Sequence, residues 1–383
     1  MTLQDSARLS ASRAPAPEWQ PQPGTCPDPD ARLRFAFSTE RDLDGWERRN
    51  LAGEVAGFWP YSLDRLSVAG APAAPETVAR VQARKLLRLG LQGNRRRSGD
   101  RPAGDLGAAW DENTLLRLAA RAPGRKLFSG VIWATDEMAR RSPLDPRMLL
   151  LRRVLRNTAG LWVLSKAQVG PLRSWLGGDW LDPDAPVRQL LFGVDQEFYQ
   201  PQPWPEGRPQ ILSVGADRDR DTATLLQAME VVRTRRPDVR IVVQVPERQA
   251  LPDGVERLPQ MNHARLREVY AETSVLVLAT RKNLHVSGVT AALEAMASGR
   301  PVVATATAGM TDYVRPNEWG FLAPVRQGEQ LAERTLQLLD DPALAWHMGE
   351  RGRHEVETCL NTERMMQDLS ALIERYVACV CTT

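Results

Sequence analysis

Short apolar runs alternate with longer amphipathic segments along most of this chain. In the clearest example, residues 274–305, an apolar run at 274–279 precedes a polar loop, a segment of helical periodicity at 289–297 and a second apolar run at 301–305. Runs without polar alternation indicate strands that are buried on both faces, as in a parallel sheet. Strand, loop, helix and strand in this order predict a βαβ unit with a right-handed crossover.

The same alternation predicts an α/β fold in both halves of the chain. In the first half we expect strands at 33–38, 59–66, 126–133 and 161–165 and helices at 74–91, 113–120, 136–151 and 167–176. In the second half we expect strands at 211–214, 240–245, 274–279 and 301–305 and helices at 222–232, 262–272, 289–297, 328–339, 343–358 and 362–376. Repeated strand–helix units predict a doubly wound parallel sheet in each half, with ligands at the carboxyl ends of its strands.

A proline-rich stretch at 200–209 marks the boundary between the two halves. We therefore expect a first domain at 31–200 and a second domain at 201–360, which suits a chain of 383 residues. Residues 1–30 are rich in proline, alanine and polar groups and predict a flexible arm. We expect residues 361–383 to form a helix that packs back on the first domain, followed by a short tail.

Charge and composition narrow the possible functions. The 50 basic and 47 acidic residues leave a net charge of +3, and the basic run Arg95–Arg97 lacks interleaved aromatic residues, so no nucleic-acid partner is expected. No apolar segment has the length of a transmembrane span and no signal-peptide core is present, so we expect a cytoplasmic protein. Four cysteines do not form a disulfide or zinc pattern, and all four histidines lie in the second half. The sequence is also compatible with a homodimer.

The loop that enters the helix at 289–297 is a candidate anion site. Ser287, Gly288, Val289 and Thr290 offer backbone N–H groups that the helix itself does not use. An ordinary solvated loop is the alternative. The chain has neither a GxGxxG motif after a strand nor a GxxxxGK[ST] motif, which argues against a dinucleotide-dependent oxidoreductase and against a P-loop NTPase.

Five motifs between residues 187 and 325 together point to a known family. They are Gly193-Val-Asp195 with Phe198 and Pro201; Ile211-Leu-Ser-Val-Gly215 with Arg218, Arg220 and Leu225-Leu226; 266–270 before an apolar run; Gly288, Leu293-Glu-Ala-Met-Ala297 and Gly299-Arg-Pro-Val-Val303; and Gly309, Asp312-Tyr-Val314 and Gly320-Phe-Leu322. In this order the second half resembles the nucleotide-sugar-binding domain of the retaining GT-B glycosyltransferases, called group 1 or family 4. The resemblance implies a GT-B fold, in which two Rossmann-like domains face a cleft. The first half matches only in its strand–helix layout and at 161–165.

The resemblance assigns roles to residues of the donor site. In the family an Arg and a Lys grip the diphosphate leaving group; here Arg220 stands at the Lys position, Ala216 replaces the Arg beside Gly215, and Arg218 is a possible substitute. Glu294 matches the glutamate that accepts hydrogen bonds from the ribose. Alternatively, the two arginines are turn residues paired with neighbouring aspartates, and Glu294 is a surface helix residue.

Two positions depart from the family pattern. The first of its two paired glutamates is Val286 here, flanked by His285 and Ser287, which could take over the contact with the donor sugar. This departure suggests a deoxy, branched or otherwise unusual sugar. In the first half, Asp136 stands near the expected position of a histidine. Asp136 is expected either to orient the acceptor or stabilise oxocarbenium charge, or to cap the helix that follows it.

These features predict a retaining glycosyltransferase that uses a nucleotide-diphosphate sugar and needs no metal ion or other cofactor. The resemblance implies a front-face displacement in which the departing diphosphate helps to deprotonate the acceptor, which would account for the lack of an obvious base. The proline-rich arm and the altered sugar motif favour a small-molecule acceptor, as in antibiotic-type metabolism. A saccharide or lipid-linked acceptor, a GT-B epimerase and a catalytically inactive auxiliary protein remain alternatives.

Overall fold

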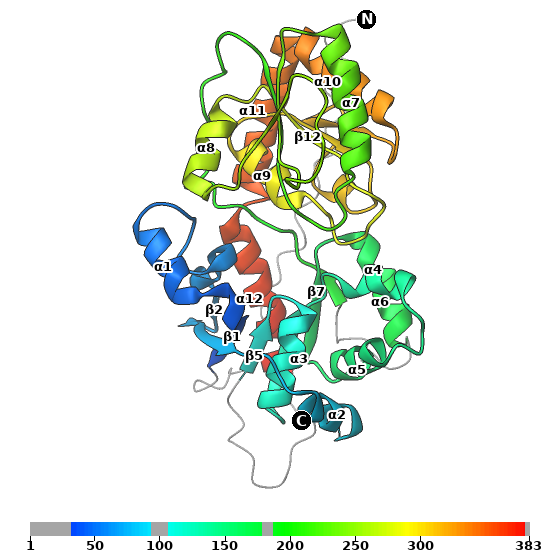
Figure 1. Ribbon diagram of the computed structural model, residues 1–383. Coiled ribbons are helices and arrows are strands. Elements are labelled where there is room, and N and C mark those ends of the chain that lie inside the picture. Colours follow the sequence, from blue (N-terminus) through cyan, green and yellow to red (C-terminus); the bar gives the residue numbers. More distant parts are fainter. Residues whose placement is uncertain (1–31, 93–105, 178–186, 380–383) are drawn as a thin grey trace, which may run out of the picture.

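The computed structural model describes residues 32–92, 106–177 and 187–379, which form two α/β domains stacked end to end (Figure 1). Each domain is built on a six-stranded, all-parallel sheet. The first sheet has the order β4-β1-β5-β6-β7-β8, with β1 at Leu33–Ser38, β4 at Ala74–Val78, β5 at Leu106–Ala109, β6 at Lys126–Gly130, β7 at Gly160–Val163 and β8 at Val187–Gln189. A two-stranded antiparallel pair, β2 (Ser67–Val68) and β3 (Ala71–Pro72), lies beside it.

The second sheet repeats this architecture. Its order is β11-β10-β9-β12-β13-β14, with β9 at Gln210–Ser213, β10 at Arg240–Val243, β11 at Val255–Arg257, β12 at Val275–Leu278, β13 at Val302–Thr305 and β14 at Gly320–Ala323. The central strands are fully buried because helices cover both faces, which explains their continuous apolar sequences. The predicted fold class, two doubly wound parallel sheets of the GT-B type, is confirmed.

The helices alternate with these strands. In the first domain they are α1 (Leu43–Leu51), α2 (Ala83–Gln92), α3 (Glu112–Arg121), α4 (Ala134–Arg140), α5 (Pro146–Leu155) and α6 (Lys166–Leu176). In the second they are α7 (Thr222–Arg235), α8 (His263–Ala271), α9 (Val289–Ala297), α10 (Gly328–Asp340) and α11 (Pro342–Thr358), followed by α12 (Thr362–Cys379). Short 3₁₀ turns are η2 (Thr39–Arg41), η3 (Pro60–Arg65) and η5 (Met310–Asp312). None of the helices described is both long and apolar enough to cross a membrane.

The final helix returns to the first domain. Figure 1 shows α12 in red, running from the junction of the domains along the first sheet. It contacts η3 and β2, and the Glu374 carboxylate accepts a hydrogen bond from the Ala69 N–H at 2.7 Å. An apolar cluster continues across the junction, where the Tyr313 hydroxyl donates to Leu164 O at 2.7 Å and accepts from Phe192 N–H at 3.0 Å.

Several predicted elements of the first domain were wrong. The strand expected at 59–66 is the 3₁₀ turn η3, which begins with Pro60 and holds Tyr61 and Ser62 at φ 64° and 53°. The helix expected over 74–91 is the strand β4 followed by α2; β4 forms one edge of the sheet, where proline is tolerated. The strands β2, β3 and β5 of this domain, and β11 of the second domain, were not predicted. The arm at 1–30 and the basic run 95–97 lie outside the described residues.

Candidate active site

The candidate site lies at the switch point of the second sheet, between β9 and β12. The strand order reverses direction there, so the loops after these two strands open side by side at the carboxyl edge. The loop after β9 contains Gly215, Arg218 and Arg220, and the loop after β12 leads into α9. The structure therefore brings together residues that the sequence analysis selected from two separate motifs.

Helix α9 begins without a side-chain cap. Its N-cap residue is Gly288, whose φ of 86° lies in the left-handed region that favours glycine. By contrast, α3, α5, α7, α8 and α11 begin at an aspartate or asparagine that accepts hydrogen bonds from the first turn. Val289 is buried and Thr290 is exposed at the start of α9. Two of the four N–H groups predicted to bind an anion are already bonded, because Ser287 N–H donates to Asn283 Oδ1 at 3.0 Å and Val289 N–H to Val286 O at 3.1 Å. Within the part of the chain described, the N–H groups of Gly288 and Thr290 are left to an external acceptor or to water.

Arg220 places a buried cation beside this helix start. One guanidinium nitrogen, Nη2, donates to Ser213 Oγ at 2.8 Å, whereas Nη1 is buried with no hydrogen-bond partner among the described residues. A Cβ atom placed on Gly288 would lie 3.7 Å from Nη1. Burial lowers the pKa of Arg220 to about 10, so the group remains charged at neutral pH. A buried charged donor without a partner is costly, and an anionic ligand at α9 would relieve that cost.

Arg218 behaves differently from Arg220. Its Nη1 donates to Glu137 of the first domain at 3.0 Å, and its guanidinium lies 4.9 Å from the ring centre of Trp133. Its side chain is 37% exposed. In this structure Arg218 therefore links the two domains at the rim of the site. Gly215 precedes Arg218 in the same loop and has a φ of 118°. Its N–H donates a hydrogen bond to Gln244 Oε1 at 2.8 Å.

Asp217, in the loop after β9, contacts two side chains of the loop after β12. Its carboxylate accepts a hydrogen bond from Ser287 Oγ at 2.6 Å and approaches His285 Nε2 at 3.3 Å. Burial raises the pKa of Asp217, but the bonds from His285 and Ser287 outweigh this effect and lower it to about 2. The carboxylate thus holds a full negative charge next to the start of α9.

The other side of His285 contacts the first domain. Asp136 accepts from His285 Nδ1 at 2.7 Å and from the backbone N–H groups of Leu284 and His285 at 2.8 and 3.1 Å. Burial lowers the pKa of His285, yet the bonds to Asp136 and Asp217 raise it to about 9, so the imidazole is protonated at neutral pH. The alternative that Asp136 caps its own helix is wrong, because α4 begins at Ala134 with Trp133 as its N-cap.

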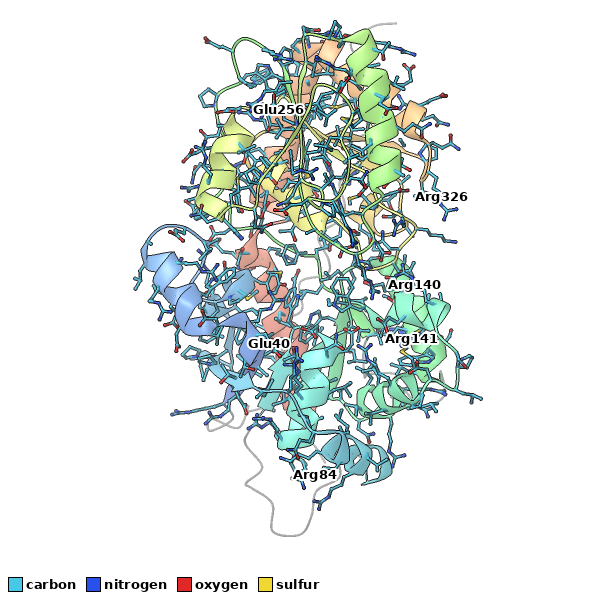
Figure 2. All side chains as sticks on the ribbon, viewed as in Figure 1. Glu40, Arg84, Arg140, Arg141, Glu256 and Arg326 are labelled. Atoms are coloured by element: carbon cyan, nitrogen blue, oxygen red, sulfur yellow. The ribbon has the colours of Figure 1, made fainter. Side chains whose placement is uncertain are left out.

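Helix α4 supplies three charged contacts to the second domain. The first is the contact of Asp136 with His285 described above. In the second, Glu137 accepts a hydrogen bond from Arg218, and in the third, Arg140 forms an ion pair with Asp219 at 2.7 Å. Figure 2 shows Arg140 where the two domains meet. The sequence analysis did not select Arg140, and it considered Asp219 only as one of the aspartates in the alternating charges at 217–221.

The position of the missing family glutamate is filled by an apolar contact. Val286 is 1% exposed, and its Cγ2 lies against Gly309, where a Cβ atom would be only 2.5 Å away. Its φ of 59° is rare for a β-branched residue and indicates local strain. Val286 therefore offers no polar group to a sugar, whereas its neighbours His285 and Ser287 both face Asp217.

Glu294 lies deeper than a surface helix residue, so that alternative is wrong. It is 5% exposed, and its two carboxylate oxygens accept from the Tyr199 hydroxyl at 2.8 Å and the Tyr270 hydroxyl at 2.9 Å. Burial raises the pKa of Glu294 to about 7. Each oxygen retains a second lone pair, so a ribose hydroxyl could share the carboxylate with the tyrosines. The predicted ribose contact stays a prediction.

Three potential metal ligands lie close together at this site. Asp217, Asp219 and His285 could offer one ligand atom each within 4.8 Å of one another. However, His285 is already hydrogen-bonded by carboxylates on both ring nitrogens. Asp219 is paired with Arg140 at 2.7 Å and lies 3.6 Å from Arg218. These cations balance the negative charge without an ion.

Comparison with known proteins agrees with this geometry. The family described as "Glycosyl transferases group 1" matches residues 208–341. The N-acetyl-alpha-D-glucosaminyl L-malate synthase of Bacillus anthracis is 31% identical over 80 residues, which are 21% of this chain and 21% of that protein. The D-inositol 3-phosphate glycosyltransferase of Streptomyces griseus is 30% identical over 145 residues, 33% of this chain and 30% of that protein. The chain therefore spans less than a third of the length of these relatives.

The fold extends the likeness over both domains. The crystal structure of Anabaena HepE in complex with UDP-glucose aligns with a TM-score of 0.63 and 13% identity, covering 89% of this chain and 99% of that one. Such a low identity supports the shared fold alone. Together with the family match, the parallel sheets and the site at their switch point lead to one conclusion. The chain has a GT-B-like fold, and residues 208–341 of its second domain match the family of glycosyl transferases group 1.

Proposed function

We propose that the protein is a retaining glycosyltransferase that moves a sugar from a nucleotide-diphosphate sugar to an acceptor. The observation that carries this proposal is the buried, unpartnered Nη1 of Arg220 beside the uncapped start of α9. A diphosphate has the charge to bind both groups, and it gains charge when the bond to the sugar breaks. Fixed positive groups aimed at that charge stabilise the transition state more than the bound substrate.

The site also accounts for the proton that the acceptor loses. The bond between the sugar C1 and the diphosphate oxygen breaks, and the acceptor atom bonds to C1 on the same face. The proton of the acceptor passes to the departing phosphate oxygen, so no protein base is needed. The protonated His285, close to Ser287 and α9, adds a second fixed cation to the leaving-group side. The reaction would then need no metal ion, and activity should persist in excess chelator.

UDP is the first nucleotide to test, because HepE was crystallised with UDP-glucose. A small polar acceptor is favoured by the names of the two relatives, which include L-malate and D-inositol 3-phosphate. The apolar Val286 leaves the donor sugar without the family's glutamate, which favours a deoxy or otherwise unusual sugar. A donor screen in which UDP-glucose is the best substrate would refute that last point.

The first test is calorimetric titration of the whole chain with UDP, GDP and dTDP, followed by an assay of donor consumption with and without acceptors. Binding of one nucleotide, with donor consumed only when an acceptor is present, supports the transferase. Binding to none of the three supports an inactive auxiliary protein. Donor loss without any acceptor supports an epimerase or a hydrolase instead.

Replacement of Asp217 tests where the anion binds. Asp217→Asn should bind UDP about tenfold more tightly, which corresponds to ~1.4 kcal/mol. The substitution removes a carboxylate that competes with the diphosphate for Ser287 and His285. Asp253→Asn, at an exposed position outside the site, serves as the control. Equal or weaker UDP binding by Asp217→Asn would mean that Asp217 organises the site rather than competing with the ligand.

Replacement of Glu294 tests the ribose contact. If the carboxylate shares a ribose hydroxyl with Tyr199 and Tyr270, Glu294→Gln should weaken UDP binding about tenfold, since hydrogen bonds to charged groups contribute ~1.5–3 kcal/mol. Calorimetry of UDP binding and thermal unfolding are measured on the same samples. A fall in Tm with unchanged UDP affinity would assign Glu294 to the core alone.

A further inference from the structure

Helices α2 and α5 form an unusually basic and apolar face at one end of the first domain. Helix α2 contains Arg84, Lys85 and Arg88, α5 contains Arg147, Arg152 and Arg153, and neither helix contains an acidic residue. The whole chain, in contrast, has 50 basic and 47 acidic residues. Such a local excess in a nearly neutral chain indicates a surface suited to an anionic partner.

Exposed leucines lie among these cations. Leu87 of α2 is 66% exposed and Leu149 of α5 is 46% exposed, while Leu144, just before α5, is 79% exposed. These are three of the six large apolar side chains that are exposed among the described residues. Their concentration on one face is a feature that soluble monomers usually avoid.

Leu87 and Leu149 line a groove between α2, α3 and α5 with a volume of about 1190 Å³. Five arginines contribute to its lining: Arg84, Arg147, Arg152, Arg153 and Arg156. In the described part of the chain, no acidic or aromatic residue lines this groove. The Nε of Arg152 is buried without a hydrogen-bond partner there, so at least one cation of the groove has donor capacity to spare.

The groove lies away from the interdomain site. Figure 1 shows α2 and α5 at the end of the first domain that is remote from the second domain, and Figure 2 shows Arg84 at the same end. A large partner bound to this face would therefore leave the loops around α9 accessible.

We propose that this α2–α5 face docks on an anionic lipid membrane, with Leu87 and Leu149 inserted among the acyl chains and the arginines bound to lipid phosphates. Apolar side chains flanked by long basic ones are typical of helices that lie in the membrane interface. Anionic lipids attract such cations near the membrane surface. A protein partner fits less well, because the central parts of protein interfaces are enriched in aromatic residues and depleted of charge.

The proposal is tested by cosedimentation of the full chain with vesicles of phosphatidylcholine alone or with added phosphatidylglycerol. We expect binding only to the vesicles that contain phosphatidylglycerol, and weaker binding as salt is raised. Leu87→Ser with Leu149→Ser, and separately Arg84→Glu with Lys85→Glu, should each lower vesicle affinity at least about tenfold. The matched controls, Leu51→Ser on α1 and Arg351→Glu on α11, change exposed residues elsewhere and should bind like the wild type.

Three outcomes would overturn the proposal. They are no binding to either vesicle, equal binding to both, and equal loss in the matched controls. The face is a site for acidic peptides instead if the double variant Leu87→Ser, Leu149→Ser binds vesicles as well as the wild type and soluble polyglutamate fully displaces the protein from them. Far-ultraviolet circular dichroism and Tm verify that each variant is folded. The result does not depend on the proposed transferase activity, which is assayed separately with soluble substrates.

Discussion

Arg220→Gln is expected to weaken UDP binding about 10- to 100-fold without loss of thermal stability. Charge-assisted hydrogen bonds contribute ~1.5–3 kcal/mol each, and Nη1 has no partner within the described chain to compensate for its burial. Sugar transfer should fall further, by about 10²- to 10³-fold, because the cation matters most when the leaving group gains charge. The Tm should stay the same or rise, since the substitution removes a buried charge whose pKa burial has already lowered to about 10.

Calorimetry, steady-state kinetics and thermal unfolding of the same preparation separate these effects. Arg326→Gln is the control, because Figure 2 shows Arg326 pointing outward from the second domain and its side chain is exposed. A lower Tm with unchanged UDP affinity would show that Arg220 supports the fold rather than the ligand. Equal losses in kcat/KM for Arg220→Gln and Arg326→Gln would mean that Arg220 has no specific role in the reaction.

The second domain was predictable because its local signals agree with its tertiary environment. β9, β12 and β13 are buried on both faces, so their sequences contain uninterrupted apolar residues that can be identified without the fold. The first domain lacks this agreement. β5 has the sequence LGAA, whose small residues give little strand signal, although the strand is fully buried between β1 and β6.

The loops of the site were predicted, but the contacts between them were not. Asp136 and His285 are 149 positions apart and meet only because the two domains close on each other. No periodicity or motif encodes that orientation. Asp217 was considered only as a local partner of the neighbouring arginines, whereas its carboxylate bonds Ser287 and His285 on the other loop.

The two positions at which this chain departs from the pattern of the family that it resembles lie close together in the structure. Val286 replaces a glutamate of the second domain, and Asp136 stands near an expected histidine of the first. In the structure an acid of the first domain bonds a histidine of the second at 2.7 Å, next to Val286. The contact between the two domains at this place therefore joins one carboxylate and one imidazole.

His285→Gln should destabilise the protein by about 3 kcal/mol at pH 6 and by much less at pH 10. In the unfolded chain a histidine has a pKa of 6.5, while the bonds to Asp136 and Asp217 raise that of folded His285 to about 9 despite burial. Folding therefore favours the protonated ring. Its contribution is fully present below pH 6.5 and is lost as the pH rises through 9. Removal of the ring also leaves two carboxylates without their shared partner.

Thermal unfolding of wild type and variant across this pH range measures the difference, and the exposed His347→Gln is the control. Asp136→Asn and the double variant complete a mutant cycle, in which the coupling should be largest at pH 6 and vanish toward pH 10. A loss of stability independent of pH would mean that His285 acts through packing alone. In the proposed function this imidazolium lies on the leaving-group side, so the rate of sugar transfer by the wild type should decline toward pH 9, and that by His285→Gln should not. A pH-dependent contact between the two domains would then stabilise the fold and set the pH range of the reaction.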